Sequence, residues 1–183
     1  MKKVEKLNTN SFSLIETLVA LSLISLLFII SIPNLSSFEK QILKTETEKL
    51  FSTIIFLQQK AVASNKGQTI TLDLTQNSYS YLKTSNNLSS HVLQQKIKFG
   101  VVKNSKGPPS SPKNLILHPI RFPIEEKTKK FVIKFFGDGK ISPGTLYLTN
   151  KKETHMTAIS IPISQVSLVR KYYLEKKNKW SLF

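Results

Sequence analysis

One apolar stretch near the start of the chain, residues 12–32, constrains the fold more than any other part of the sequence. It reads FSLIETLVALSLISLLFIISI and contains no Lys, Arg, Asp, Gly or Pro. About 20 such residues are needed to cross a bilayer as a helix. Lysines in the preceding segment 1–11 favour a cytoplasmic N-terminus. The sequence therefore predicts a single membrane helix, with everything after Pro33 outside the cytoplasm.

Glu16 is the ionisable residue inside this stretch. A charged side chain at mid-bilayer costs roughly 2.5 kcal/mol or more, so it normally has a partner or a function. A secretory signal peptide would have a shorter apolar region, of about 7–15 residues, ending at a small-residue cleavage site. Residues 31–34 offer no such site. A plain membrane anchor explains the length and the lysines but leaves Glu16 unexplained.

Residues 11–16 read SFSLIE and resemble the class III signal of type IV pilins and pseudopilins. In that family prepilin peptidase cleaves on the cytoplasmic side of the membrane helix and methylates the new N-terminus. The resemblance implies cleavage between Ser11 and Phe12, and N-methylation of Phe12. It also matches Glu16 and Pro33 to the glutamate and the helix-bending proline of the family. The family usually has Gly before the cut, where this chain has Ser11.

The resemblance also implies a function for Glu16 in assembly. An ionised carboxylate in lipid favours a nearby cation. In an assembled filament, the N-terminal amine of a neighbouring subunit, created by cleavage before Phe12, would supply that cation. The pair would set the axial register of the subunits.

The sequence beyond Pro33 predicts an amphipathic helix that continues the membrane segment to about residue 65, with a kink at the proline. Glu46 interrupts the apolar stripe and is expected on a wetter face of this helix. Gly67 is available for a left-handed cap at its end. The apolar positions recur mostly three or four residues apart, at Leu35, Phe38, Ile42, Leu50, Ile54, Leu57 and Ala61.

Alternating and turn-rich patterns predict a β domain from Gln68 onward. Residues 131–136 and 144–148 flank a GDG turn and are expected to form a hairpin, and a second hairpin is expected near the C-terminus. The region 103–114 is expected to be a loop. The expected strands are 69–74, 79–82, 92–102, 115–117, 131–136, 144–148, 155–161 and 166–173.

The FFGDG strand end, the GTLYL strand and the closing hairpin resemble the C-terminal domain of the GspH/FimT pseudopilin family. The resemblance implies an α+β fold, in which one long N-terminal helix packs on an antiparallel β domain of two small sheets. The first half of that helix is transmembrane and the second half is amphipathic. The expected parts are a cleaved cytoplasmic leader 1–11, a membrane and filament-core helix 12–33, a stalk helix 34–66, a GspH/FimT-like β domain 67–174 and a basic-aromatic tail 175–183.

The residue types argue against an enzyme. The chain has no cysteine, which excludes disulfides and thiolate metal sites, and its three histidines lie far apart. The GDG turn contains one carboxylate, Asp138, whereas Ca²⁺ binds several oxygens from closely spaced acidic residues. No nucleotide-binding loop or catalytic set is recognisable. The sequence predicts a non-enzymatic protein with no cofactor and no metal.

The net charge of +16 indicates an anionic partner, such as nucleic acid, lipid headgroups or an acidic protein, unless it reflects a lysine-rich proteome. Cations and aromatics alternate near the C-terminus, a mixture that could hold phosphates and stack the bases of single-stranded nucleic acid. It could also be a terminal strand with an aromatic anchor or a contact with a neighbouring subunit. The candidate nucleic-acid contacts are Arg170, Lys171, Tyr172, Lys176, Lys177 and Trp180.

The sequence as a whole predicts a minor pilin or pseudopilin of a filament that starts from the bacterial inner membrane, in type II secretion or a type IV pilus. Its expected partners are other subunits, prepilin peptidase and the inner-membrane assembly platform. The chain would cross the membrane once, with its β domain in the periplasm, and then enter a periplasmic filament. The alternative is a DNA-binding minor pilin that takes part in DNA uptake through its basic tail.

Overall fold

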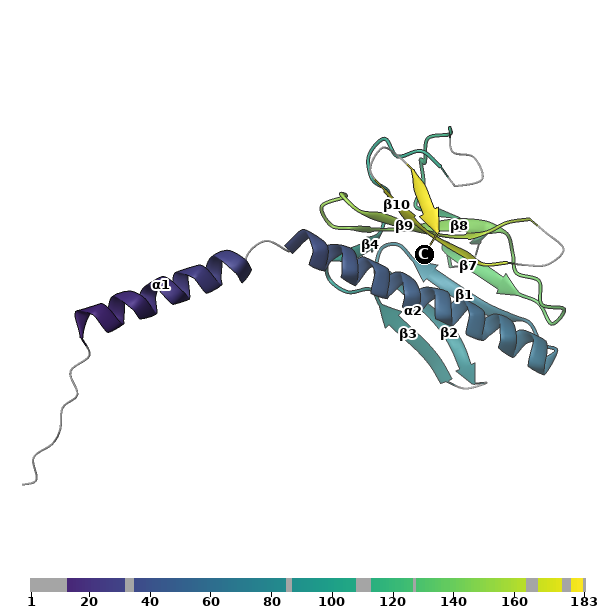
Figure 1. The fold of residues 1–183 in the computed structure, drawn as a ribbon. Coiled ribbons are helices and arrows are strands. Elements are labelled where there is room, and N and C mark those ends of the chain that lie inside the picture. The colour runs from purple at the N-terminus through teal and green to yellow at the C-terminus, as the bar shows by residue number, and fades with distance from the viewer. Residues whose placement is uncertain are drawn as a thin grey trace, which may run out of the picture. The chain divides into compact units, whose positions relative to one another are not determined.

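The structure is a computed structural model of the 183-residue chain. It divides into two compact units, Met1–Ser37 and Phe38–Phe183, whose elements are labelled in Figure 1. The leader 1–11, the predicted cleavage site and Pro33 lie outside the described residues. The structure describes residues 13–31, 35–84, 87–107, 113–126, 128–163, 168–175 and 179–182.

Two helices replace the single long helix that the sequence predicts. Helix α1 covers Leu14–Ser31, and helix α2 covers Leu35–Ser64. Residues 32–34, where the kink was expected, lie outside the described part of the chain. Within the residues that the structure describes, no helix is long and apolar enough to cross a membrane.

Helix α2 buries one continuous stripe, which differs from the predicted stripe near its start. Leu50, Ile54, Leu57 and Ala61 are fully buried, as predicted, and Leu43 joins them. Ile42 is half-buried and packs at the edge of the core, whereas Phe38 is exposed and lies off the stripe. The expectation for Glu46 is wrong, because this residue and Thr47 are fully buried and fill the gap between Leu43 and Leu50. The buried stripe of α2 is therefore apolar except at Glu46 and Thr47.

Helix α2 ends in a left-handed residue, but that residue is Asn65 rather than the predicted Gly67. Asn65 has φ 48°, and its N–H donates to the carbonyl of Val62 at 3.2 Å. The N–H of Lys66 donates to the carbonyl of Ala61, also at 3.2 Å. These two bonds form a Schellman motif, in which Asn tolerates the conformation usually given to Gly.

The strands form two antiparallel sheets, which together with the helices confirm the α+β class. Among the described residues, one sheet has the order β3-β2-β1-β7-β6, and the other has the order β11-β10-β9-β8-β4, with β5 also paired to β8. The first sheet comprises β1 Gln68–Asp73, β2 Ser78–Thr84, β3 Asn87–Val92, β6 Ile124–Glu125 and β7 Lys130–Phe135. The second comprises β4 Ile97–Phe99, β5 Ile120–Arg121, β8 Gly144–Asn150, β9 Met156–Ile161, β10 Arg170–Leu174 and β11 Trp180–Leu182.

Three strand predictions are wrong. Residues 115–117 do not form a strand, since Leu115 makes an isolated bridge with Lys106 and β5 begins only at Ile120. Strands β7 and β8 do not form a hairpin, because β7 pairs with β1 and β6 in the first sheet while β8 pairs with β9 in the second. The GDG segment between them connects the two sheets. The alternating run 92–102 is also not one strand, since β3 ends at Val92 and a turn precedes β4. The predicted pairing of β9 with β10 is confirmed.

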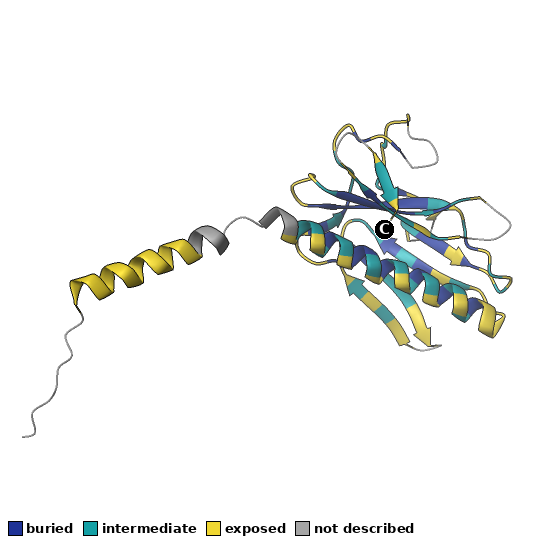
Figure 2. Cartoon of the chain, viewed as in Figure 1, coloured by how far each residue is buried: buried dark blue, intermediate teal, exposed yellow. Residues whose placement is uncertain are grey.

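The main core joins α2 to both sheets, and a second, smaller core lies on the other face of the second sheet. Alternate residues of β8 divide between the two cores, with Leu146 and Leu148 in the first and Tyr147 in the second. Figure 2 shows the resulting buried strip through the second sheet. The second sheet is therefore covered on both faces, and residues of β10 and β11 take part in the outer cover. Around Tyr147, Met156 and Ala158 this cover comprises Val101, Val102, Ile116, Tyr172, Leu174 and Trp180.

Candidate assembly interface

Glu16 closes a local hydrogen-bond pattern at the start of α1. Its Oε2 accepts from the N–H of Ser13 at 2.9 Å, and the Oγ of Ser13 accepts from the N–H of Ile15 at 3.3 Å. This reciprocal arrangement is a capping box, which satisfies N–H groups that the first helical turn leaves without partners. The sequence analysis missed it, although the S-x-x-E spacing of residues 13–16 is a recognisable signal.

The side chains of α1 present apolar surface on every side. From residue 13 to residue 27 each of them is exposed, as the yellow helix in Figure 2 shows. A helix that is apolar all round is buried in a core or a membrane in its working state. This surface of α1 is therefore a candidate for contact with lipid or with other protein chains. The large exposed side chains are Leu14, Ile15, Leu18, Val19, Leu21, Leu23, Ile24, Leu26 and Leu27.

A buried carboxylate ties α2 to the edge strand β3. Glu46 is fully buried, and its Oε2 lies 2.9 Å from the Nε2 of His91. Its Oε1 accepts from the Nζ of Lys49 at 2.8 Å. Burial alone would raise the pKa of Glu46, but the hydrogen bonds from Lys49 and His91 outweigh it and lower the pKa below the ordinary 4.5. The ring of Tyr79 lies 5.0 Å from that of His91 and completes the contact.

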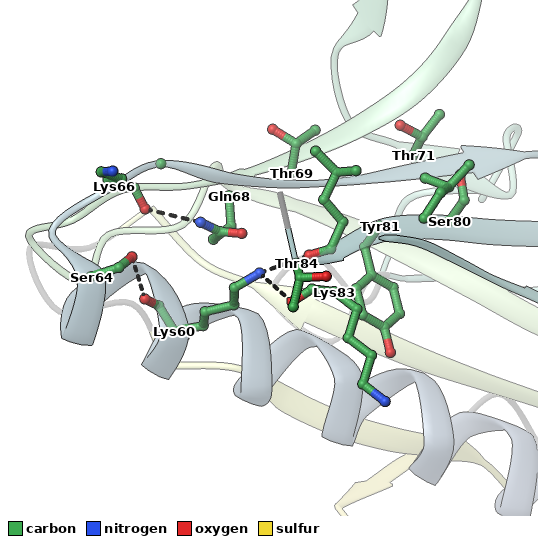
Figure 3. Close-up of a pocket in the computed structure, with 13 residues that line it drawn as sticks. Lys60, Ser64, Lys66, Gln68, Thr69, Thr71, Ser80, Tyr81, Lys83 and Thr84 are labelled. Carbon is green, nitrogen blue, oxygen red and sulfur yellow. Dashed lines mark hydrogen bonds between the residues drawn. The ribbon is translucent and has the colours of Figure 1, made fainter. Parts of the chain in front are cut away.

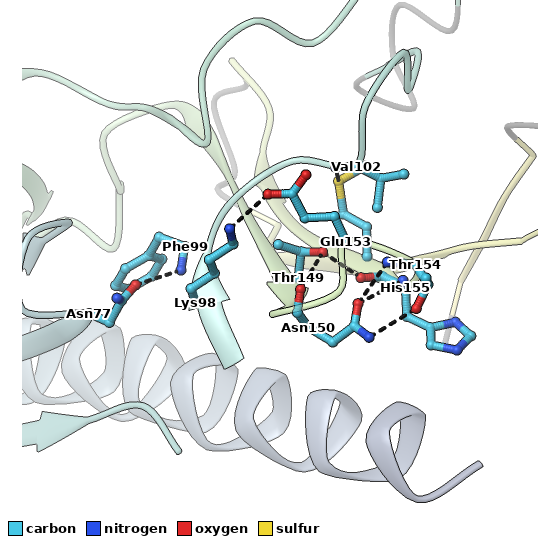
Figure 4. A network of polar contacts seen from close by, with 10 residues as sticks. Asn77, Lys98, Phe99, Val102, Thr149, Asn150, Glu153, Thr154 and His155 are labelled. Carbon is cyan, nitrogen blue, oxygen red and sulfur yellow. Dashed lines mark hydrogen bonds and ion pairs between the residues drawn. The ribbon is translucent and has the colours of Figure 1, made fainter. Parts of the chain in front are cut away.

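A second polar contact fixes the start of α2 to the turn between β8 and β9. The Oδ1 of buried Asn150 accepts from the N–H groups of Thr154 and His155 at 2.9 and 3.0 Å, as Figure 4 shows. Its Nδ2 donates to Glu39 of α2 at 2.8 Å. The hydrogen bonds from Asn150 and Lys152 lower the pKa of Glu39. This arrangement fixes Glu39 of α2 to the turn between β8 and β9 within the second unit.

The predicted nucleic-acid residues in β10 are mostly engaged within the fold. Lys171 pairs with Glu48 of α2, and its Nζ lies 4.4 Å from the centre of the Phe51 ring. Tyr172 packs on the second core, and Arg170 is exposed. The contacts of Lys171 with Glu48 and Phe51 thus hold β10 against α2.

The C-terminal segment of the predicted tail is a paired strand. Trp180 begins β11, which pairs with β10. Its Nε1 donates to the carbonyl of Lys106 at 2.8 Å, and its ring lies 6.1 Å from that of Tyr147. Trp180 therefore anchors a terminal strand, one of the alternatives left open by the sequence. Lys176 and Lys177 lie outside the described residues.

An open groove lies between the C-terminal end of α2 and strands β1 and β2. Figure 3 shows three lysines at this groove, Lys60, Lys66 and Lys83. The Nζ of Lys60 donates to the carbonyls of Leu82 and Lys83 at 2.8 and 2.9 Å, so it stabilises the strand end. In the described part of the chain, no group of His, Cys, Asp and Glu could hold a metal ion.

No family model and no curated protein sequence matches this chain. Among solved structures, it is similar to a structure of the minor pseudopilin EpsH from the type 2 secretion system of Vibrio cholerae. The identity is 9%, the TM-score is 0.44, and the match covers 77% of this chain and 95% of that chain. A crystal structure of the same pseudopilin gives 12% identity and a TM-score of 0.40, with 79% and 97% covered. Both similar structures are pseudopilins, the class that the sequence resembles, but values this low assign neither a family nor a function to this chain.

Proposed function

We propose that the chain is a non-enzymatic minor pilin or pseudopilin, a structural subunit of a filament that is assembled from the bacterial inner membrane in type II secretion or a type IV pilus. Residues 1–11 are a leader removed by prepilin peptidase, and residues 12–33 are the membrane and filament-core helix. Residues 34–66 are the stalk, and residues 67–174 are the domain presented to partner subunits, followed by the tail 175–183.

The observation that carries this proposal is the N-terminal segment. A lysine-bearing leader precedes SFSLIE and an apolar helix whose described side chains are all exposed. Such a surface needs lipid or neighbouring helices around it. Glu16 lies in the first turn of α1, four residues after the N-terminus that cleavage before Phe12 would create, and its carboxylate accepts from the N–H of Ser13.

The capping box gives Glu16 a structural role in addition to the proposed role of its charge in assembly. Substitution can separate the two roles. Glu16→Gln retains an oxygen that can accept from the Ser13 N–H, because capping boxes use Gln as well as Glu. It removes the negative charge that would pair with the amine of a neighbouring subunit. Glu16→Ala removes both the hydrogen bond and the charge.

The test combines processing and assembly in cells that contain the matching secretion or pilus machinery. Intact-mass measurement should give a chain that begins at N-methylated Phe12. Both Glu16→Gln and Glu16→Ala should be processed but fail to enter filaments. If Glu16→Gln assembles like the wild type, the carboxylate is a helix cap and the register function is wrong. A chain that retains residues 1–11 contradicts the pilin assignment as a whole.

The DNA-binding alternative depends on the basic tail. Trp180 and Lys171 are held within the fold, and Arg170 is exposed. A gel shift with single-stranded DNA across salt concentrations tests this alternative. Affinity that falls with salt and is abolished by Arg170→Ala with Lys176→Ala and Lys177→Ala supports it, whereas no shift at low salt rejects it.

A further inference from the structure

The start of α2 and the two loops beside it carry a dense group of lysines. Lys40 and Lys44 lie on α2, Lys96 and Lys98 lie at the β3–β4 connection and β4, and Lys151 and Lys152 lie in the β8–β9 turn. These six residues, here called the proximal lysine cluster, come from three separate parts of the sequence. Only the folded second unit brings them to one end.

Backbone and side-chain contacts hold the three parts together. The N–H of Lys151 donates to the carbonyl of Lys96 at 2.9 Å, which joins the β8–β9 turn to the β3–β4 connection. The Nζ of Lys152 lies 3.0 Å from Oε1 of Glu39, which joins the same turn to α2. The Asn150 contact with Glu39 reinforces this link. The lysines therefore lie on one surface whose three parts are held together by hydrogen bonds and an ion pair, and not on independent loops.

Within the described residues, Lys40, Lys96 and Lys151 form no ion pair with a carboxylate, whereas two other members of the cluster do. Glu39 pairs with Lys152, and Glu153 pairs with Lys98 at 2.7 Å. Aromatic rings lie beneath other members of the cluster. The Nζ atoms of Lys40 and Lys44 lie 4.5 and 5.5 Å from the centre of the Tyr173 ring, and the Nζ of Lys96 lies 5.6 Å from that of Phe38. A contact with an aromatic face does not neutralise the charge of Lys40 or Lys96.

The aromatic ring of Phe38 is itself 57% exposed, beside the lysines. Cations beside an exposed apolar ring are the chemistry of segments that bind at the boundary between lipid headgroups and acyl chains. Clusters of about 4–8 basic residues next to a membrane helix attract anionic lipids. The composition of this surface thus fits a negatively charged bilayer better than it fits a groove-binding peptide.

The chain itself limits how far this surface can lie from the end of α1. Three residues separate Ser31, the last residue of α1, from Leu35, the first of α2. Four steps of extended chain span at most about 14 Å. The first lysine of the cluster follows five residues later, in the second turn of α2. Under the proposed function, in which residues 12–33 sit in the membrane, the length of the connection therefore allows the cluster to reach the membrane surface.

We propose that the proximal lysine cluster docks the second unit on the anionic phospholipid headgroups of the membrane that holds residues 12–33. Docking would restrain the folded unit before the subunit enters a filament and would be released on extraction. The lysines at the opposite end of α2 serve as an internal comparison. Lys60 lies 20 residues beyond Lys40, which is about 30 Å along the helix, and its Nζ binds backbone carbonyls.

The test uses the full chain in lipid nanodiscs, either of neutral phosphatidylcholine or with about one third phosphatidylglycerol. Because the chain contains no cysteine, Gln95→Cys gives a single site beside the cluster for a fluorescent label. Thr69→Cys, at the start of β1, gives a control site beyond the other end of α2. A lipid with a spin label on its headgroup quenches a fluorophore that lies at the membrane surface.

The label at position 95 should be quenched in anionic nanodiscs, and much less in neutral ones or at 0.5 M NaCl, since salt screens the attraction. Substitution of three cluster lysines, Lys40→Gln with Lys96→Gln and Lys151→Gln, should weaken docking by about 100-fold, at roughly five-fold per lysine. The matched control, with three distant and exposed lysines replaced, should weaken docking by less than about five-fold. That control combines Lys66→Gln, Lys83→Gln and Lys134→Gln.

Three results would overturn the inference. Equal quenching in neutral and anionic nanodiscs removes the charge dependence, and equal effects of the two triple variants remove the assignment to this cluster. A single-stranded oligonucleotide that binds through the cluster, when lipid gives no quenching, assigns the charge to nucleic acid instead. A chain that fails to enter either nanodisc contradicts the membrane anchor of the proposed function, and the docking with it. A chain that enters both without quenching contradicts docking alone.

Discussion

The buried carboxylate of Glu46 allows a quantitative test of what α2 contributes to the fold. Its partners both reach solvent, since the side chains of His91 and Lys49 are 34% and 44% exposed. The pair with Lys49 is close to a surface pair and contributes about 0.2–1 kcal/mol. A hydrogen bond to a charged group contributes about 1.5–3 kcal/mol, and the amide of Glu46→Gln keeps part of it. Glu46→Gln should therefore destabilise the protein by about 1–2 kcal/mol.

Glu46→Leu should cost less than Glu46→Gln, although it removes more hydrogen bonds. It places an apolar side chain in the gap between Leu43 and Leu50, where burial contributes about 1.5–3 kcal/mol. It leaves no charge buried without a partner, because His91 and Lys49 can be hydrated. Replacing buried ion pairs by apolar residues is often neutral, or stabilising by about 1–4 kcal/mol. The expected result is a protein as stable as the wild type, or more stable by up to about 2 kcal/mol.

The assay is urea unfolding of the three proteins, followed by circular dichroism at pH 7 and at lower pH. The pKa of Glu46 is lowered in the folded state, so its stabilising contribution is present above the ordinary pKa of 4.5 and is lost as pH falls through the folded value. Glu46→Leu has no carboxylate to protonate, so its free energy of unfolding should rise relative to that of the wild type below about pH 4.5. Amide exchange in β3 should nevertheless be faster in Glu46→Leu, because the link to His91 is gone.

The reasoning is refuted if Glu46→Leu is less stable than Glu46→Gln at pH 7. It is also refuted if the difference between the wild type and Glu46→Leu does not change in acid. Lys49→Gln serves as the control, since it removes only the exposed partner and should cost less than about 1 kcal/mol.

Substitutions at three further positions test the packing of the second unit, each by thermal unfolding followed by circular dichroism. Asn65→Ala should cost about 1–2 kcal/mol, because φ is 48° there, whereas Asn65→Gly should cost less. Asn150→Ala should cost about 2–3 kcal/mol, because it removes the hydrogen bonds that the buried Asn150 side chain makes with the N–H groups of Thr154 and His155 and with Glu39. Trp180→Ala should cost about 2–3 kcal/mol through lost packing on Tyr147, and Trp180→Phe should recover most of that loss. Equal losses for the two members of either pair would contradict the reasons given for Asn65 and Trp180.

Local patterns in the sequence predict the elements of this fold better than their partners. The stripe of α2 from Leu50 to Ala61 follows helical spacing, and its burial is confirmed. The β9–β10 pair is confirmed because its two strands are neighbours in both sequence and space. The segment 131–148 has the same local appearance, but β7 finds its partner in β1, about 60 residues earlier. The residues of the GDG turn give no information about which distant strand β7 pairs with.

The polar contacts of the two helices show the same limit. The capping box of Ser13 and Glu16 spans three residues, so its spacing is visible in the sequence. Glu46 and His91 are 45 residues apart, and Asn150 and Glu39 are 111 residues apart. A buried carboxylate on an apolar stripe is stable only because a distant strand supplies its partner. Helical spacing alone favours an exposed position for Glu46, and that expectation is wrong because β3 supplies His91 as a partner for the buried carboxylate.

The chain passes repeatedly between the two sheets, and this affects how the second unit can come apart. The first sheet takes β1–β3 and then β6 and β7, while the second takes β4 and β5 and then β8–β11. Neither sheet is a continuous segment, and both share one core with α2. Because detaching either sheet would expose the face of the other, the second unit should unfold in a single cooperative transition. A proteolytic cut between β7 and β8 would consequently separate strands without releasing a fragment that can fold by itself.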